Sequence, residues 1–219
     1  MYSLFFNQLY LLSYIIVVVI MYPVIGIISR KSKSEKGHDI SYIYNDIVSA
    51  VIKSKGIPIG ITSDNIDLYL DICDGFILQG GDDIMKEDLD MINKLYKLDI
   101  PLLGICLGMQ EMGYAFDGEI IDVDNHIDNK LHDIVINNDS ILYKIFNCER
   151  TIVNSRHKSA IKNSSLFVSA KSGDGVTEAI EDKNKKFFVG VQWHPENMIN
   201  SDILSRRLFD YFIEICMKK

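Results

Sequence analysis

The stretch Pro101-Leu-Leu-Gly-Ile-Cys106-Leu-Gly108-Met-Gln110 predicts a buried strand that turns sharply into a helix. The apolar run from Ile100 to Ile105 has the length of a strand, and the residues from Met109 to Phe116 can continue as a helix. Cys106 would then lie in the turn, where the flanking glycines let the backbone bend without a Cβ clash. A helix N-terminus also stabilises a thiolate, so Cys106 is a candidate nucleophile, with a buried structural cysteine as the alternative.

A second segment supplies the base that a thiolate nucleophile needs. Phe187-Phe-Val-Gly-Val-Gln192-Trp-His194-Pro-Glu196 is an apolar strand that ends in a histidine. In an extended chain, residues i and i+2 project on the same side, so His194 and Glu196 can face one way. A carboxylate beside an imidazole fixes its tautomer and stabilises the imidazolium form. The sequence therefore predicts a catalytic set of Cys106, His194 and Glu196, although this segment alone also fits a structural histidine–carboxylate pair.

The composition suits one globular domain with a sizeable core, because 47% of the 219 residues are hydrophobic and 24% are charged. A net charge of −7 argues against a nucleic-acid partner, which would favour a basic surface. The four cysteines are widely spaced and include no C-x-x-C pair, which favours free thiols in a reducing, cytoplasmic compartment. No zinc-ligand spacing is present, and we expect neither a metal nor a cofactor.

The N-terminus is unusual, because no charged side chain occurs from Met1 to Ser29 and residues 9–20 are almost wholly apolar. About 20 apolar residues can span a bilayer, and the basic residues from Arg30 to Lys36 would hold that flank in the cytoplasm. Yet Pro23 to Ser29 resembles the first strand of the domain. We therefore expect an extension over residues 1–20 and a catalytic domain over residues 21–219. The extension is a membrane anchor, a targeting segment or, as we favour, sequence translated ahead of a true start at Met21.

Strands and helices alternate from Pro23 onward, which indicates a parallel sheet covered on both faces. The predicted strands are Val24–Ile28, Ile57–Ile61, Gly75–Gln79 and Pro101–Ile105. The predicted helices are an amphipathic one over Ile43–Ile52 with Asp39 as its cap, a short one over Ile66–Ile72, and one over Glu87–Leu98.

After Asp117 the chain consists of short β-like runs separated by turn signals, which predicts antiparallel additions to the edge of the sheet. These runs are Ile134–Ile136, Thr151–Asn154, Leu166–Ala170, Val176–Ile180 and Phe187–Gln192. Ser201 can cap a last amphipathic helix with Leu204, Leu208, Phe212 and Ile213 facing inward. The predicted fold is thus α/β, with an open, mostly parallel sheet, helices on both faces and antiparallel edge strands.

Taken together, these segments resemble the class I (triad) glutamine amidotransferases, and more narrowly the γ-glutamyl-γ-aminobutyrate hydrolases, also called the C26 peptidases. The resemblance runs from about Pro23 to the C-terminus, with the motifs in the family's order, and it implies a flavodoxin-like fold. The matching stretches are Pro23-Val-Ile-Gly-Ile-Ile, Ile77-Leu-Gln-Gly-Gly-Asp-Asp83, Gly104-Ile-Cys-Leu-Gly-Met-Gln110, Val153-Asn-Ser-Arg-His157, Asp174-Gly-Val-Thr-Glu-Ala-Ile180 and Gly190-Val-Gln-Trp-His-Pro-Glu196.

The resemblance implies acyl transfer through a thioester on a small γ-glutamyl substrate. Cys106 would attack the γ-carboxamide of glutamine or of a γ-glutamyl amine, His194 would carry the proton, and Glu196 would orient His194. The resemblance assigns the remaining roles to two groups of residues. The oxyanion would bind backbone N–H groups at Leu107 and around Gly80-Gly81, and the substrate would contact Gln110 and His157.

The sequence also departs from the family pattern. Leu107 stands where the hydrolases often have arginine, which is closer to glutaminase domains that feed ammonia to synthetases. Ser155-Arg-His157-Lys-Ser159 replaces the usual Ser-x-His-His-Gln, so Arg156 and Lys158 would suit a more anionic substrate. The paired glycines that usually follow the nucleophile helix are missing as well. Two alternatives therefore stay open: a glutaminase that acts with a synthetase partner, and a catalytically silent member of the fold.

Four further signals remain, and all but Trp193 favour structural roles. Asp122-x-Asp124-x-His126-x-Asp128 alternates oxygen ligands like a calcium loop, but it lacks the glycine and the glutamate that such a loop requires. Asp82 and Asp83 are expected to cap the next backbone segment. Trp193 is either core packing or a wall of the pocket, and Cys73, Cys148 and Cys216 are expected to be structural.

Overall fold

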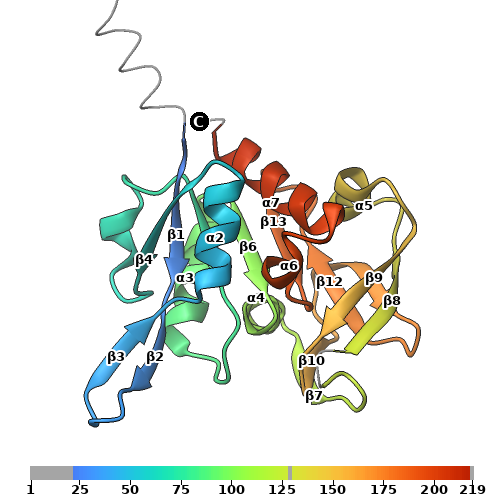
Figure 1. The fold of residues 1–219 in the computed structure, drawn as a ribbon, viewed down its shortest axis with the longest axis horizontal. Coiled ribbons are helices and arrows are strands. Elements are labelled where there is room, and N and C mark those ends of the chain that lie inside the picture. The colour runs from blue at the N-terminus through green and yellow to red at the C-terminus, as the bar shows by residue number, and fades with distance from the viewer. Residues whose placement is uncertain (1–21, 128–129, 218–219) are drawn as a thin grey trace, which may run out of the picture.

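The computed structural model of the protein describes residues 22–127 and 130–217. Its centre is a nine-stranded sheet in the order β4-β1-β5-β6-β13-β12-β11-β8-β9 (Figure 1). The predicted N-terminal extension, the start at Met21 and the calcium-loop residue Asp128 lie outside the described residues. Among the described residues, no helix combines the length and the apolar character that crossing a bilayer requires.

One half of the sheet is parallel and forms the doubly wound part of the fold. Its strands are β1 (Val24–Ile28), β4 (Ile57–Ile61), β5 (Gly75–Leu78), β6 (Leu102–Ile105) and β13 (Phe188–Val191). Every neighbouring pair among them is parallel. When these five strands are numbered by their order in the chain, their order across the sheet is 2-1-3-4-5, which is the flavodoxin-like order. The predicted fold class is therefore confirmed.

The other half of the sheet is antiparallel, as the short β-like runs predict. It contains β8 (Lys130–Ile136), β9 (Arg150–Ser155), β11 (Phe167–Ser172) and β12 (Thr177–Glu181). A separate two-stranded ribbon pairs β7 (Glu119–Asp122) with β10 (Ser159–Lys162), and the sequence did not predict these two strands.

Helices cover both faces of the sheet and create two apolar cores. α2 (Asn45–Lys53), α5 (Ile141–Phe146) and α7 (Ile203–Cys216) pack on one face, and α3 (Lys86–Lys97) and α4 (Leu107–Ala115) pack on the other (Figure 1). β5 is buried throughout, with Ile77 in the first core and Phe76 and Leu78 in the second. Burial on both sides explains why the parallel strands are continuous apolar runs. Trp193 is 1% exposed and lies in the first core, so it is a packing residue.

The prediction that Asp39 caps α2 is wrong. Asp39 begins β3 (Asp39–Tyr42), which pairs with β2 (Arg30–Lys33) in an antiparallel hairpin. Gly37 closes this hairpin with a φ of 81°, a conformation that glycine adopts without steric cost. α2 starts later, after Tyr44, which has an extended backbone and makes no side-chain cap.

Other helix termini also differ from the predictions. The last helix is capped by Asp202 instead of Ser201, because the Asp202 carboxylate accepts a 2.7 Å hydrogen bond from the backbone N–H of Ser205. The helix predicted over Ile66–Ile72 is a single 3-10 turn, η1 (Ile66–Tyr69). α5 was not predicted, because its six residues are too few to show a helical period.

Candidate active site

Cys106 occupies a strained turn between β6 and α4. Its backbone has φ 53° and ψ −107°, a left-handed φ that non-glycine residues seldom adopt. Such a conformation costs roughly 1–3 kcal/mol and persists only where the surroundings enforce it. Here the backbone N–H of Cys106 donates a 2.8 Å hydrogen bond to the Val191 carbonyl of the neighbouring strand. The turn lifts the side chain out of the sheet edge, as the sequence predicts.

The two flanking glycines leave space for close packing, but they do not form the bend at Cys106. Neither Gly104 nor Gly108 has a positive φ, so the strain lies at the cysteine. A Cβ atom on Gly108 would lie 2.2 Å from the Leu78 carbonyl oxygen, and one on Gly104 would lie 2.5 Å from the Met112 sulfur. The glycines therefore allow α4 to approach the parallel strands closely, which sets the position of Cys106.

His194 lies between Cys106 and Glu196. It follows β13 and precedes α6 (Pro195–Met198), so Glu196 comes from the first turn of a short helix and not from the extended segment that the sequence predicts. His194 Nδ1 donates a 2.7 Å hydrogen bond to Glu196 Oε1, and the ring lines the same cavity as the Cys106 side chain. Asn154 holds the backbone of His194 from both sides, at 2.8 Å and 3.0 Å. The sequence did not single out Asn154.

The electrostatics favour a charged imidazole at this position. Burial lowers the pKa of His194, but the hydrogen bonds to Cys106 and Glu196 outweigh it, and the pKa rises to about 10. An imidazolium ion beside the sulfur is the arrangement that activates cysteine nucleophiles. The three predicted catalytic side chains therefore lie around one cavity, with His194 hydrogen-bonded to Glu196.

Gly80 and Gly81 follow β5 and line a cavity of about 270 Å³ together with the three catalytic side chains. A Cβ atom on Gly80 would lie 3.1 Å from His194 Cε1, so the loop passes directly beside the imidazole. Leu107 is the first residue of α4, where backbone N–H groups have no intrahelical partner. The predicted oxyanion donors thus flank Cys106 on two sides.

Arg30 supports the diglycine loop from behind. Its buried guanidinium donates to the carbonyl oxygens of Gln79 at 2.5 Å and Gly80 at 3.2 Å. It also donates to the carboxylates of Asp88 at 2.6 Å and Glu111 at 2.9 Å. Because the C=O and N–H of a trans peptide point in opposite directions, the N–H groups that follow these carbonyls face away from Arg30. The sequence treats Arg30 only as part of a basic flank, and its structural role was missed.

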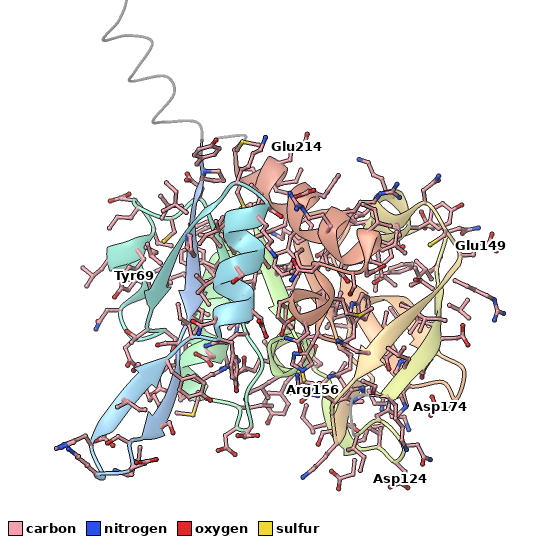
Figure 2. The ribbon with its side chains drawn as sticks, viewed as in Figure 1. Tyr69, Asp124, Glu149, Arg156, Asp174 and Glu214 are labelled. Carbon is pink, nitrogen blue, oxygen red and sulfur yellow. The ribbon has the colours of Figure 1, made fainter. Side chains whose placement is uncertain are left out.

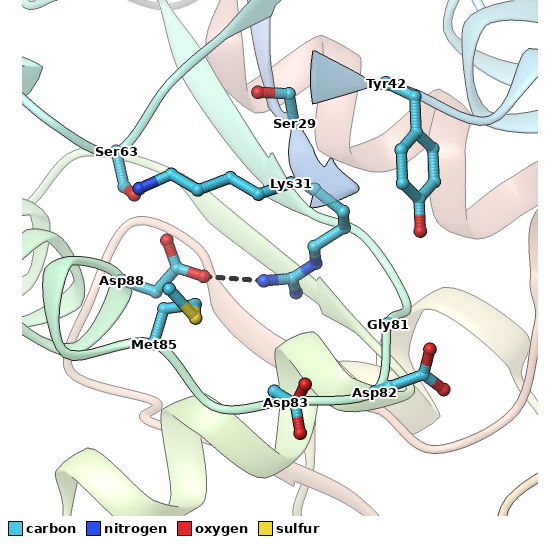
Figure 3. A pocket seen from close by; sticks show the side chains of 10 residues that line it. Ser29, Lys31, Tyr42, Ser63, Gly81, Asp82, Asp83, Met85 and Asp88 are labelled. Atoms are coloured by element: carbon cyan, nitrogen blue, oxygen red, sulfur yellow. Dashed lines mark hydrogen bonds and ion pairs between the residues drawn. The ribbon is translucent and has the colours of Figure 1, made fainter. Parts of the chain in front are cut away.

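The other side of this loop borders a second cavity, of about 100 Å³. Figure 3 shows Asp82 and Asp83 on the loop and the dashed interaction of Asp88 with the guanidinium. The two aspartates do not cap α3, because the residue that precedes this helix is Met85. Asp82 lines both cavities.

Gln110 and His157 do not line the catalytic cavity. Gln110 Nε2 donates to the Ser159 carbonyl at 2.7 Å and to Gln192 Oε1 at 3.1 Å. Gln192 Nε2 in turn lies 3.7 Å from the Cys106 sulfur. His157 is 4% exposed and faces other histidines in the antiparallel half. Gln110 is therefore connected to Cys106 only through Gln192, and His157 lies in the interior of the antiparallel half, so neither residue borders the cavity.

The outer wall of the cavity joins elements that are distant in the sequence. Arg156 Nη1 donates to Asn197 Oδ1 at 2.7 Å, and Asn197 Nδ2 donates to Asp46 Oδ2 at 2.8 Å. Figure 2 shows Arg156 between the parallel and antiparallel halves. Tyr44 completes the wall; its hydrogen bond with Tyr42, together with burial, raises its pKa to about 12 and keeps it a neutral donor. Of these wall residues, the sequence pointed only to Arg156, because the others lie in no motif.

Comparisons with known proteins agree with this geometry. A family model described as peptidase C26 matches residues 23–87 and 85–196. A glutamine amidotransferase-like protein of Rickettsia prowazekii is 28% identical over 277 residues, covering 88% of this chain and 97% of the relative. The γ-glutamyl-γ-aminobutyrate hydrolase PuuD of Escherichia coli K12 is 28% identical over 238 residues, covering 89% and 93%.

A solved structure shares the fold at low sequence identity. The glutaminase domain of Trypanosoma brucei CTPS with bound acivicin has a TM-score of 0.69 and 18% identity, covering 90% of this chain and 94% of that one. The family match extends over both the nucleophile turn and the segment with His194 and Glu196. The chain is therefore a hydrolase of amide carbon–nitrogen bonds and belongs to the peptidase C26 family.

Proposed function

We propose that this protein hydrolyses the γ-glutamyl amide bond of glutamine or of a γ-glutamyl amine through a thioester on Cys106. The observation that carries the proposal is the placement of His194, which lines the same cavity as Cys106 and hydrogen-bonds the Glu196 carboxylate. A base held by a third group is the requirement for a cysteine nucleophile.

The chemistry follows in two halves. The Cys106 sulfur attacks the γ-carbonyl carbon while His194 holds the thiol proton, and that proton passes to the amine nitrogen as the carbon–nitrogen bond breaks. Water then attacks the thioester carbon and gives a proton to His194. The carbon–sulfur bond breaks, glutamate leaves, and the proton returns to the sulfur. Glu196 keeps the imidazole in the tautomer that both halves need.

The tetrahedral oxyanion of each half would accept hydrogen bonds from the N–H groups of Leu107 and Gly81. Preorganised donors of this kind contribute about 3–4 kcal/mol each to the stability of the transition state. The hydrogen bonds from Arg30 to the carbonyls of the loop hold its peptide groups in one orientation. The donors therefore need little reorganisation when charge develops on the substrate oxygen.

The cavity walls complement the two charges of a glutamyl group. Asp46 and Asp82 provide negative charge and Arg156 provides positive charge around the same 270 Å³ space. An α-ammonium group would pair with the carboxylates, and an α-carboxylate would accept two hydrogen bonds from the guanidinium. This arrangement supports a free α-amino acid moiety on the acyl side of the scissile bond.

A second candidate is a glutaminase that supplies ammonia to a synthetase partner. The observation in its favour is Leu107, which makes the nucleophile segment Cys-Leu-Gly-Met-Gln closer to glutaminase domains than to the γ-glutamyl amine hydrolases. In that case glutamine would be the substrate, and turnover would depend on the partner.

A panel of substrates separates these possibilities. Amine or ammonia release is measured from glutamine and from several γ-glutamyl amines with the wild type, with Cys106→Ser and with Cys148→Ser. Cys148→Ser is a matched control, since Cys148 is a partly buried thiol that does not line the catalytic cavity. We expect release by the wild type and Cys148→Ser and its loss in Cys106→Ser. Equal release by Cys106→Ser would refute the thioester proposal. Turnover of glutamine alone, and only with a synthetase added, would favour the second candidate.

A further inference from the structure

Three histidines and one glutamate from separate segments meet inside the antiparallel half of the molecule. This His/Glu cluster consists of His126 after β7, His132 on β8, His157 between β9 and β10, and Glu178 on β12. Potential ligand atoms of His126, His132 and Glu178 all lie within 4.8 Å of one another. The hydrolytic mechanism above uses none of these four side chains.

The distances within the His/Glu cluster fit a single small ion. Glu178 Oε1 lies 3.5 Å from His126 Nδ1, 3.2 Å from His132 Nε2 and 3.7 Å from His157 Nε2. Four ligands held about 2.0–2.1 Å from a tetrahedral ion are separated from one another by about 3.4 Å. The observed separations need little adjustment to reach that geometry.

The inner atoms of the cluster lack ordinary hydrogen-bond partners. Glu178 has no exposed surface, and neither of its carboxylate oxygens makes a hydrogen bond of acceptable geometry. The same holds for His132 Nε2 and His157 Nε2, although both lie close to the carboxylate. A buried carboxylate without such partners is costly, and coordination of a cation removes that cost.

The outer nitrogens of two of the histidines are already engaged. His157 Nδ1 donates to the Ser159 carbonyl at 3.0 Å, and His126 Nε2 donates to Asp174 Oδ2 at 3.0 Å. Figure 2 places Asp174 beside the β8–β9 end of the molecule. These hydrogen bonds put the ring protons on the outside and direct the lone pairs of His157 Nε2 and His126 Nδ1 into the cluster. Metal-binding histidines are oriented in this way.

Ser155 leaves the inner nitrogen of His126 available. Its hydroxyl lies 3.2 Å from His126 Nδ1, but it donates its proton to the His126 carbonyl oxygen at 2.8 Å. Asp174 is held as an outer partner by the Ser172 hydroxyl, which donates a 2.5 Å hydrogen bond to its other carboxylate oxygen. The outer hydrogen-bond partners of His126 and His157 are therefore in place without an ion.

We propose that His126, His132, His157 and Glu178 bind one divalent transition-metal ion, with Zn²⁺ as the best match. Three imidazoles and one carboxylate suit Zn²⁺, while Mg²⁺ and Ca²⁺ prefer sites made of oxygen ligands. Four protein ligands leave no open position, so the ion is structural. The competing explanation is a metal-free cluster in which protonated imidazoles balance the charge of Glu178.

The site would also steady the hydrolytic centre. Along residues 154–157, the side chains alternate between the catalytic cavity and the His/Glu cluster. On the cavity side, Asn154 hydrogen-bonds the backbone of His194 and Arg156 lines the cavity. Ser155 and His157 face the cluster. An ion bound to His157 therefore limits the movement of the segment that presents Asn154 and Arg156 to the substrate.

The test uses the full chain, purified without a polyhistidine tag, stripped with a chelator and dialysed against Zn²⁺, Mg²⁺ or buffer. Metal is counted by mass spectrometry and the melting temperature is measured for each sample. We expect one Zn²⁺ per chain, a higher melting temperature with Zn²⁺ and no change with Mg²⁺. Loading with Co²⁺ should give the visible absorption of a four-coordinate ion.

Variants assign the ligands. His132→Gln and Glu178→Gln should weaken Zn²⁺ binding by about 100-fold or more, while His38→Gln, an exposed histidine in the β2–β3 turn, should bind as the wild type does. His132 is 20% exposed, so its variant is expected to fold even where Glu178→Gln does not. A folded wild type that takes up no Zn²⁺, or a folded His132→Gln that binds it with unchanged affinity, would overturn the proposal in favour of the metal-free cluster.

Discussion

Replacing Gly108 with alanine should destabilise the fold and slow catalysis, although the change is favourable for an isolated helix. Alanine at a helical position gains about 1 kcal/mol over glycine. In this structure, however, the added Cβ would lie 2.2 Å from the Leu78 carbonyl oxygen and 2.6 Å from the Leu78 Cβ. Restoring an ordinary contact requires α4 and β5 to separate by about 1 Å. Overpacking costs about 1–3 kcal/mol, and the clash with a backbone oxygen places this site near the upper end, at about 2–3 kcal/mol. After the helical gain is subtracted, we expect a net loss of about 1–2 kcal/mol.

The displacement should affect activity more than stability. The N-terminus of α4 carries both the Cys106 sulfur and the Leu107 N–H, so a shift of about 1 Å moves them away from the Gly80-Gly81 loop and can cost about 100-fold in kcat. Urea denaturation gives the change in the free energy of unfolding, and amine release gives kcat. Gly173→Ala is the control, because nothing lies within 4 Å of a Cβ at that position. A Gly108→Ala protein as stable as Gly173→Ala would refute the reasoning.

Two further predictions concern His194 and the last helix. Glu196→Gln should lower kcat/KM by about 10²–10⁴ and slow alkylation of Cys106 at neutral pH, because the pKa of His194 falls once the carboxylate charge is lost. The folded-state pKa of about 10 exceeds the ordinary 6.5, so the stabilisation by charged His194 is complete below pH 6.5 and is lost as the pH rises to 10. The advantage of the wild type over Glu196→Gln in free energy of unfolding should therefore shrink across that range; a constant advantage would contradict the assignment. Asp202→Ala should cost about 1 kcal/mol in urea denaturation by removing the cap of α7, whereas Ser201→Ala should cost less than half of that; equal losses would restore Ser201 as the cap.

The parallel half of the sheet was predictable because its strands are covered on both faces. Burial makes β1, β5 and β6 short apolar runs, and the helices between the strands show amphipathic periods. The edge strand β4 is apolar as well, although it is only partly buried. The hairpin of β2 and β3 was not predictable in this way, since its residues are mostly exposed and polar. Asp39 has the chemistry of a helix cap, but that signal is local and the pairing of β3 with β2 overrides it.

The candidate site also has a part that was predictable from the sequence and a part that was not. Cys106, His194 and the diglycine loop begin one to three residues after the ends of strands, so each lies close to an apolar run in the sequence. The remaining wall of the cavity comes from α2, the β9–β10 connection and α6, which meet only in the folded chain. The His/Glu cluster was missed for the same reason, because its members are separated by up to 52 residues from first to last. His126 was instead grouped with the nearby aspartates of an apparent calcium loop.

The proposed nucleophile and base follow two strands that are hydrogen-bonded neighbours. In β6 and β13, Ile105 is in register with Val191, and Cys106 and His194 come one and three residues later. Changes in the surrounding loops can therefore alter the cavity without altering the distance between sulfur and imidazole. On the proposed function, recognition of the acyl group can diverge among descendants of this chain through Asp46 and Arg156, while the pairing of Cys106 with His194 is inherited unchanged.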